Sequence, residues 1–280
     1  MSSSCYVVER SHADKPGYWR LAFDGRENCQ GVQAGQFVHI LPRPSDGSDP
    51  LLRRAFSILS VKGNIVEVLF RVQGKGTTSL SRLRSGDTVD VLWPLGLPFP
   101  VAQGPLILVG GGVGVPPMLA LASQEAGKAR REELTVIIGG RSENDILCQE
   151  DFHALGINPL ICTEDGSLGE RGLVTQTLQR LFSTEAPPEQ KTPGTMMFHV
   201  KPTVYACGPL GMLKAIAAIC QEAEVSCLVS LEENMPCGIG VCNGCVVPTH
   251  NAQGSDFDRY RRICVEGPGV WAREIDWSAF

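Results

Sequence analysis

Short apolar runs alternate with polar positions through the first hundred residues of the chain. Turn-forming residues such as Pro16-Gly17 and Ser85-Gly86-Asp87 separate these runs. Short strands at this spacing, without a helical period between most of them, predict an antiparallel β-barrel or sandwich over residues 1–100. The predicted strands lie at residues 5–10, 18–23, 36–42, 55–61, 65–72 and 88–94.

The pattern changes over residues 101–230, where apolar runs alternate with segments of helical period. This alternation predicts a doubly wound α/β domain with a parallel sheet. The predicted strands lie near 105–110, 133–139, 158–163, 202–208 and 226–231, and the predicted helices near 115–126, 146–155, 173–183 and 209–223. The Pro-rich, charged stretch 184–200 predicts an exposed loop, and residues 231–280 form a third, small region with little regular pattern.

Composition narrows the class of protein. The 280 residues are 43% hydrophobic, the net charge is -5, and the Lys and Arg residues are scattered. These values are typical of a globular protein and argue against a nucleic-acid surface. The N-terminal residues lack the apolar core of a signal peptide, and glycines and prolines interrupt the most apolar stretch, 105–122. We therefore expect a cytoplasmic protein without a membrane span.

Four of the eleven cysteines are bunched near the C-terminus, in the order Cys237, Cys242, Cys245 and Cys264. An odd total and no secretory signal argue against a disulfide framework. The spacing Cys-x4-Cys-x2-Cys with a later fourth cysteine is that of a plant-type 2Fe–2S site. The interspersed glycines allow the backbone to bend and to aim N–H groups at the sulfurs. A zinc ion and unligated thiols are the alternatives.

A glycine-rich segment, Gly110 to Gly114, directly follows the predicted strand at 105–110, and Pro116 and Pro117 follow it. Glycines between a buried strand and a helix let the backbone approach a pyrophosphate, which the helix N-terminus then stabilises. Proline is tolerated in the first turn of that helix. The segment predicts a nucleotide site at Gly111, Gly112, Gly114 and Pro116; a tight turn without a ligand is the alternative.

The pattern GGxGxxP behind a β-rich first half resembles the ferredoxin–NAD(P) reductase superfamily, in which a flavin-binding barrel precedes a nicotinamide domain. The segment Arg54-Ala55-Phe56-Ser57 resembles its flavin motif. By this resemblance Arg54 holds the FAD pyrophosphate, Phe56 packs on the flavin, and Ser57 hydrogen-bonds near its N5. The resemblance also assigns Leu69, Phe70, Arg71, Gly76 and Thr77 to the flavin, and Cys207, Gly208 and Pro209 to the nicotinamide side.

The order of flavin region, nicotinamide region and cysteine cluster resembles the electron-transfer subunits of NAD-dependent dihydroorotate dehydrogenases, as do the phrases GQFVHI, LEENMPCGIGVCNGC and YRRICVEGPGV. This resemblance implies an FAD-binding barrel (1–100), an NAD-binding domain (101–230) and a 2Fe–2S domain (231–280). It also implies an FMN-containing catalytic subunit as partner, in a heterotetramer of two of each. Ala55, where that family often has proline, and the long 184–200 stretch depart from the pattern.

A chain with these three sites converts two-electron transfer into one-electron transfer, since a nicotinamide gives only electron pairs and a cluster accepts single electrons. By resemblance, electrons pass from dihydroorotate through FMN, the cluster and FAD to NAD, a step of pyrimidine biosynthesis. Subunits of sulfide dehydrogenase and of NADH-dependent ferredoxin–NADP oxidoreductase share the three-part plan and remain alternatives. A zinc-stabilised interaction protein is the alternative from another class. Arg141 is a candidate for the 2′-phosphate of NADPH and equally for a solvated residue.

Overall fold

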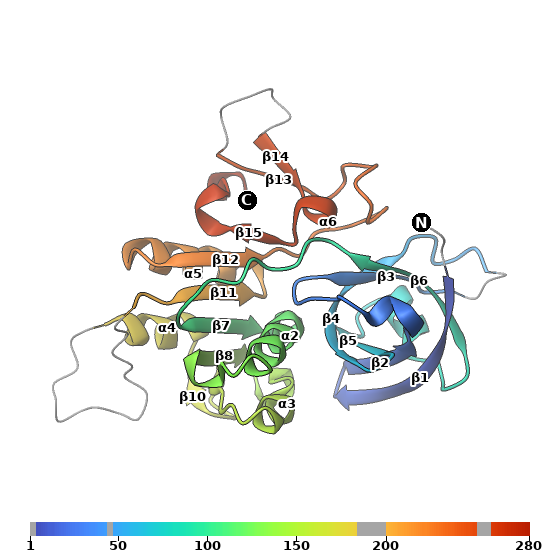
Figure 1. The fold of residues 1–280 in the computed structure, drawn as a ribbon, viewed down its shortest axis with the longest axis horizontal. Helices are drawn as coiled ribbons and strands as arrows, with labels where there is room; N and C mark the ends of the chain where they lie inside the picture. The colour runs from blue at the N-terminus through green and yellow to red at the C-terminus, as the bar shows by residue number, and fades with distance from the viewer. Residues whose placement is uncertain (1–3, 44–46, 184–199, 251–258) are drawn as a thin grey trace.

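The structure is a computed structural model that describes residues 4–43, 47–183, 200–250 and 259–280. A barrel and an α/β sheet lie side by side, and the C-terminal segment covers the junction between them (Figure 1). The exposed loop predicted for 184–200 falls mainly on residues outside the described ranges. Among the described residues, no helix is both long and apolar enough to cross a bilayer.

The N-terminal part is a closed antiparallel barrel with the strand order β1-β2-β5-β4-β3-β6. Its strands are β1 (Ser4–Lys15), β2 (Tyr18–Asp24), β3 (Phe37–Leu41), β4 (Arg54–Lys62), β5 (Ile65–Arg71) and β6 (Thr88–Leu95). Its helical segments are η1 (Arg26–Cys29) and α1 (Lys75–Leu80). All six predicted strands are present, and of the two predicted architectures the structure has the barrel.

The alternation of inward-facing and outward-facing side chains explains why these strands form a barrel with an apolar interior. Successive residues of a strand point to opposite faces, and the fully buried Val66 and Val68 of β5 join the same apolar cluster as Phe70, two residues further along. Val38 and Ile40 of β3 belong to that cluster too. The intervening residues of β3 therefore face outward, toward the C-terminal segment.

The second part is a seven-stranded sheet with the order β10-β9-β8-β7-β11-β12-β15. Its strands are β7 (Leu106–Gly111), β8 (Leu134–Gly140), β9 (Leu160–Thr163), β10 (Glu170–Arg171), β11 (Thr203–Cys207), β12 (Ser226–Ser230) and β15 (Gly269–Trp271). Its helical segments are η2 (Gly112–Gly114), α2 (Val115–Ala126), η3 (Arg131–Glu133), η4 (Glu143–Asp145), α3 (Gln149–Ala154), α4 (Val174–Phe182) and α5 (Leu210–Glu222). The predicted doubly wound domain is confirmed.

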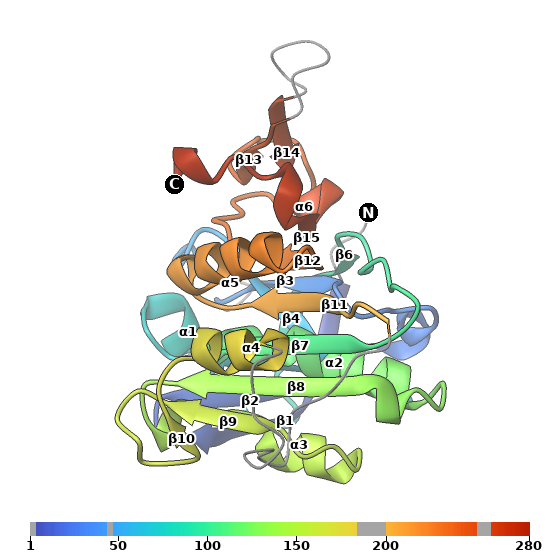
Figure 2. The same cartoon turned by 90° about the vertical axis from the view of Figure 1, so that its left-hand side faces the viewer.

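Two apolar layers cover the sheet because its central strands are buried on both faces. Leu106 and Leu108 of β7 pack in one cluster with α2 and α3, whereas Ile107 and Val109 pack in another with α4 and α5. Figure 2 shows α4 and α5 on the face turned to the viewer. The strand direction is parallel except for β15, which pairs antiparallel with β12.

The order of the strands creates a switch point. The chain leaves β7 toward β8 and β9 and returns on the other side of β7 as β11. Loops that leave neighbouring strands in opposite directions open a crevice at the carboxyl ends of the strands, which is where open α/β sheets bind ligands. Here those loops are the glycine-rich segment after β7 and the Cys207–Pro209 turn after β11.

The C-terminal segment contains β13 (Val246–Pro248) paired with β14 (Tyr260–Arg262), α6 (Ile263–Glu266), η7 (Ala272–Glu274) and η8 (Trp277–Ala279). It shares an apolar cluster with α5, to which Cys245, Ile263 and Cys264 contribute. Through β15 it also extends the central sheet. The cysteine-rich region is thus fixed firmly to the nicotinamide-side sheet.

Candidate redox site

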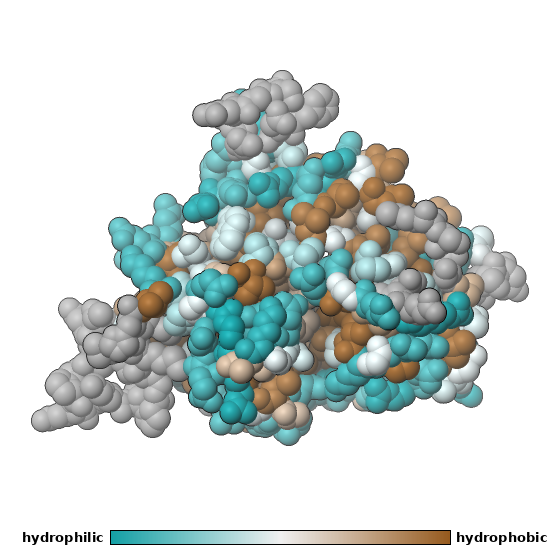
Figure 3. Space-filling view, in the orientation of Figure 1, coloured by the Kyte–Doolittle hydropathy of each residue, from teal (hydrophilic) through white to brown (hydrophobic). Residues whose placement is uncertain are grey.

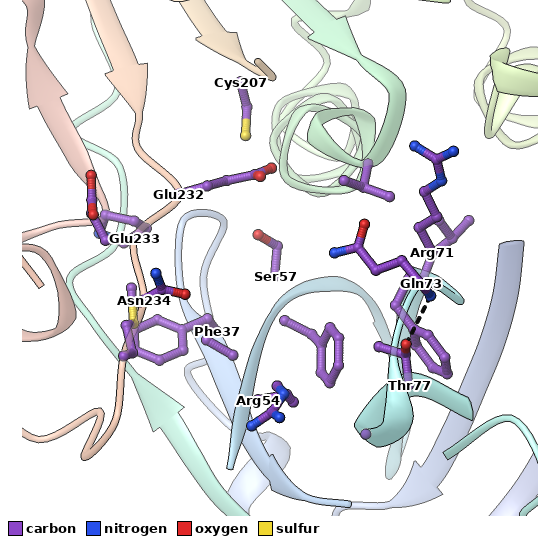
Figure 4. Close-up of a pocket in the computed structure, with 18 of the residues that line it drawn as sticks. Phe37, Arg54, Ser57, Arg71, Gln73, Thr77, Cys207, Glu232, Glu233 and Asn234 are labelled. Carbon is purple, nitrogen blue, oxygen red and sulfur yellow. Dashed lines mark hydrogen bonds between the residues drawn. The ribbon is translucent and has the colours of Figure 1, made fainter. Parts of the chain in front are cut away.

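A cavity of about 680 Å³ separates the barrel from the segment that follows β12. Every residue that the flavin resemblance assigns lines this cavity: Arg54, Ala55, Phe56, Ser57, Leu69, Phe70, Arg71, Gly76 and Thr77. Strands β4 and β5 supply most of them, and the first turn of α1 supplies Gly76 and Thr77. Figure 4 shows Arg54, Ser57, Arg71 and Thr77 on one side of the cavity and residues 232–234 on the other.

Arg54 is one of three cationic residues that line this cavity, with Arg71 and Lys75. Its Nη1 donates to the backbone oxygens of Leu52 (2.8 Å) and Arg53 (3.0 Å). No carboxylate in the described ranges pairs with it. A Cβ added at Gly76 would lie only 3.2 Å from Nε of Arg54, so the glycine allows the guanidinium to approach the turn. An unpaired, fixed guanidinium fits a pyrophosphate.

The turn at Gly76 and the wall of the cavity are both well ordered by local contacts. Thr77 Oγ1 accepts hydrogen bonds from the backbone N–H groups of Gln73 (3.0 Å) and Gly74 (3.2 Å). The rings of Phe56 and Phe70 lie 5.1 Å apart between centroids, tilted by 38°. The cavity therefore joins an aromatic wall to a cationic end, as an FAD molecule requires.

A second cavity of about 600 Å³ opens at the switch point of the sheet. Gly111, Gly112 and Pro209 of the predicted nucleotide site line it, together with residues 139–141 at the end of β8. The other predicted residues do not line it: Cys207 lines the first cavity, and Gly114, Pro116 and Gly208 line neither.

Gly114 has a packing role that the sequence did not indicate. A Cβ at this position would lie 2.2 Å from the carbonyl oxygen of Cys207 and 2.5 Å from the backbone nitrogen of Gly208. Both atoms belong to backbone that cannot rotate away. Gly114 thus lets the glycine-rich segment and the Cys207–Pro209 turn meet. Gly112 has a φ of +53° and open space around its Cα, so its lack of a side chain leaves the second cavity clear.

Arg141 is bound to a carboxylate on the rim of this second cavity. Its Nε lies 3.3 Å from Oδ2 of Asp145, whose Oδ1 accepts a hydrogen bond of 2.6 Å from Tyr18. Burial and the hydrogen bond to Asp145 raise the pKa of Tyr18 to about 12. Burial opposes ionisation of Asp145, but Tyr18 and Arg141 outweigh it and lower the pKa of that carboxyl. Glu164, after β9, also lines the cavity.

Glu232 lines both cavities and was missed by sequence reasoning. Ser57, Cys207 and Glu232 point toward a common space between the flavin-side and nicotinamide-side residues (Figure 4). The side chain of Glu232 is exposed to the open cavity. The neighbouring protein nevertheless removes part of the water around its carboxyl, and this desolvation raises its pKa. Burial also raises the pKa of the Cys207 thiol well above its ordinary value. The only signal in the sequence that could have indicated Glu232 was the acidic pair Glu232-Glu233 directly after the predicted strand at 226–231.

Backbone N–H groups surround the four bunched thiols. The N–H of Gly240 donates to Sγ of Cys264 (3.2 Å), and that of Gly244 to Sγ of Cys242 (3.4 Å). The backbone nitrogens of Ile239 and Cys264 lie 3.5 Å from Sγ of Cys237 and 3.4 Å from Sγ of Cys245, respectively. Donors aimed at sulfur stabilise thiolates and the clusters that they bind.

The thiols interact in two pairs, Cys237 with Cys242 and Cys245 with Cys264. Burial opposes ionisation of Cys237, but N–H groups of the loop outweigh it and lower its pKa to about 6. Burial and the neighbouring Cys245 raise the pKa of Cys264 to about 12. Within the described ranges, no three metal-ligating side chains converge on one point. Four thiols in two pairs match the ligand set of a 2Fe–2S cluster, in which two cysteines bind each iron.

Apolar side chains surround the cysteine loop on its outer face. Ile239 is 40% and Val241 75% exposed, and Val246 and Val265 are also accessible. Figure 3 shows hydrophobic atoms gathered on this part of the surface, beside the position of α6 in Figure 1. Contiguous exposed apolar residues of this kind mark interaction surfaces.

Two known protein families match parts of the chain. The iron–sulfur cluster binding domain of dihydroorotate dehydrogenase B matches residues 232–276. The oxidoreductase NAD-binding domain matches residues 108–218.

Curated relatives cover nearly the whole chain. The electron transfer subunit of dihydroorotate dehydrogenase B (NAD(+)) from Desulforamulus reducens is 35% identical over 268 residues, 94% of each chain. The subunit of the same name from Listeria monocytogenes serotype 4a is 37% identical over 276 residues, 96% of each chain.

Solved structures show the same architecture. The structure of an NADH-dependent reduced ferredoxin–NADP oxidoreductase aligns with a TM-score of 0.79 and 25% identity, over 99% of this chain and 92% of the other. A ferredoxin–NADP+ reductase from Neisseria gonorrhoeae with bound FAD and NADP aligns with a TM-score of 0.60 and 16% identity, over 80% of this chain and 92% of the other. The latter likeness shows the fold alone.

Proposed function

The chain belongs to the family of dihydroorotate dehydrogenase B electron transfer subunits, and from this membership we propose that it relays electrons between a dihydroorotate-oxidising subunit and NAD. The observation that carries the proposal is the placement of three candidate sites in sequence across one molecule. The nicotinamide cavity adjoins the flavin cavity through Glu232 and Val113, and the flavin cavity adjoins the cysteine loop through residues 232–235. When bound, FAD exchanges electron pairs with a nicotinamide and single electrons with a 2Fe–2S cluster.

Arg54 and the Gly76–Thr77 turn would hold the pyrophosphate of FAD, while Phe56 and Phe70 would support its ring system. Ser57, Cys207 and Glu232 would surround the place where a nicotinamide meets the flavin. Burial raises the pKa of both Glu232 and Cys207, so each would hold its proton to a higher pH than in water. Cys237, Cys242, Cys245 and Cys264 would hold the cluster.

The rim of the nicotinamide cavity supports NADH over NADPH. The cation that could receive a 2′-phosphate, Arg141, is already neutralised by Asp145. Glu164 adds a further negative charge to the same cavity. An acidic group at the end of a strand of the nicotinamide sheet accepts a hydrogen bond from the 2′-hydroxyl of NAD and repels the extra phosphate of NADP.

The partner in this proposal is an FMN-bearing catalytic subunit, in a heterotetramer with two copies of each chain, and the assembly works in the cytoplasm. The exposed apolar residues around the cysteine loop, Ile239 and Val241 above all, supply a docking surface. Docking there brings the cluster close to the FMN. A patch that is apolar at its centre is typical of stable interfaces.

One observation favours a second candidate. The reductase that aligns with a TM-score of 0.79 is described as an NADH-dependent reduced ferredoxin–NADP oxidoreductase. The same three sites would then serve a ferredoxin-linked partner in place of a dihydroorotate-oxidising one.

Reconstitution tests the proposal. The purified chain should oxidise NADH with an artificial one-electron acceptor but leave dihydroorotate untouched. Addition of the co-purifying FMN-bearing subunit should produce NADH from dihydroorotate and NAD. Oxidation of dihydroorotate by the chain alone would overturn the subunit role, and co-purification with a ferredoxin-linked protein would establish the second candidate.

A further inference from the structure

His39 is a fully buried polar residue that the relay described above leaves unexplained. It lies in β3 and is 0% exposed. Its backbone pairs with Ala55 of the flavin-lining strand β4 on one side and with Leu92 of β6 on the other. Because Val38 and Ile40 point into the barrel, the side chain of His39 leaves the barrel toward the C-terminal segment.

The imidazole ring rests on the backbone of the cysteine loop. A Cβ built on Gly238 would lie 2.5 Å from Nδ1 of His39 and 3.0 Å from Cε1. Gly238 directly follows Cys237, and its φ is +70°. The ring therefore reaches from the flavin-lining sheet to the residue beside a candidate cluster ligand.

Neither ring nitrogen makes a hydrogen bond of regular geometry within the described ranges, although backbone groups of Met235 and Cys237 come close enough to interact with the ring. The polar groups that act on the ring are the backbones of Met235 and Cys237 on one side and the guanidinium groups of Arg53 and Arg54 on the other. Arg53 also donates from Nη1 to the backbone oxygen of His39 (3.2 Å). Buried polar atoms are nearly always paired, so we expect this ring to use a partner on the side of the cysteine loop, where Met235 and Cys237 lie.

We propose that His39 is a positioning residue that holds the cysteine loop in register with the flavin strand and directs one ring N–H toward the loop or the group bound by its cysteines. This inference rests on the proposed function, because it presupposes a cluster at the four cysteines. It assigns to His39 a role in setting the reduction potential of that cluster. Hydrogen bonds to the sulfurs help to set the potential of an iron–sulfur centre, and an N–H donor raises it because it stabilises the added negative charge of the reduced cluster.

The test compares substitutions that separate the polar group from the packed volume. His39→Leu keeps an apolar side chain of similar reach without a donor, whereas His39→Asn retains an N–H near the position of Nδ1. Ile40→Val is the matched control, because it loosens the same strand on the opposite face. For each full-length variant we would measure the midpoint potential of the cluster by redox titration followed by electron paramagnetic resonance, together with iron and FAD content.

We expect a lower cluster potential in His39→Leu than in the unmodified chain, and little change in His39→Asn and Ile40→Val. FAD content should remain at one per chain in all of them. An unchanged potential in His39→Leu with full iron content would overturn the inference and leave the relay itself intact. Equal loss of iron in His39→Leu and His39→Asn would also overturn it, because packing alone would then explain the residue.

A second measurement does not depend on a stable His39→Leu protein. Gly238→Ala places a methyl group against the ring, so it should speed the release of iron to a chelator. In a His39→Ala background the ring is absent, and the same substitution should speed release less. Equal acceleration in both backgrounds would show that the ring does not position the loop.

Discussion

Replacement of Gly114 by alanine tests how the switch point is built. The added Cβ would lie 2.2 Å from the carbonyl oxygen and 2.3 Å from the carbonyl carbon of Cys207. Real contacts of this kind do not occur, so the glycine-rich segment and the Cys207–Pro209 turn must separate. Overpacking of a well-packed interior costs about 1–3 kcal/mol, and here the atoms that must move are backbone. We expect a loss of that size, with a fall in Tm of about 2–12 °C.

The same displacement should raise the KM for NADH, because the turn that moves borders the nicotinamide cavity. Thermal unfolding, the KM for NADH with an artificial acceptor and the FAD content report the three effects separately. FAD content should not change, since the flavin-lining residues belong mainly to β4, β5 and the first turn of α1. Gly63→Ala, in the turn between β4 and β5, is the matched control: its Cβ meets no atom within 4 Å, it lines neither cavity, and its positive φ alone costs about 1–2 kcal/mol. A Gly114→Ala protein as stable as the unmodified chain, with the same KM, would refute the packing role.

Four further predictions concern the other sites. Cys264→Ser should lose most of the iron and keep FAD, as measured by metal analysis and flavin absorbance; a full, unchanged cluster spectrum would contradict the ligand assignment. Arg54→Ala should weaken FAD binding by about 1.5–3 kcal/mol, because it removes a charge-assisted contact, and an unchanged affinity in a flavin titration would count against the assignment. In stopped-flow reduction by NADH, the rate should fall as pH rises through the raised pKa of Glu232, and Glu232→Gln should abolish that inflection; a profile identical in both proteins would exclude a role for the carboxyl. Ile239→Asp should impair dihydroorotate-dependent turnover with the partner subunit more than the NADH–acceptor activity of the isolated chain; equal loss of both activities would argue against docking at this residue.

The regular parts of the fold could be predicted from sequence because their patterns are long. Each barrel strand shows alternation, and each central strand of the sheet, such as β7, is a continuous apolar run bounded by turn residues. Short elements carry too little pattern. β15 has only three residues after Pro268, and its place at the edge of the sheet depends on contacts with β12 that no local signal reveals.

The candidate site likewise contains residues that could be predicted from the sequence and residues that could not. The cysteine spacing and the glycine-rich segment are local motifs, so they could be found directly. Glu232 could not, because an acidic residue before a loop is usually solvated, and only the fold places it between two cavities. His39 looks like an ordinary polar position of a strand. Its burial follows from the C-terminal segment, which is distant in sequence and packs across the outer face of β3.

Anaerobic titration of the purified chain with NADH tests the relay most directly. The account predicts flavin absorbance that bleaches on addition of NADH, followed by the paramagnetic signal of a reduced 2Fe–2S cluster, with two irons per chain. Flavin that bleaches without any cluster signal, or a colourless protein that contains one zinc ion, would contradict the account.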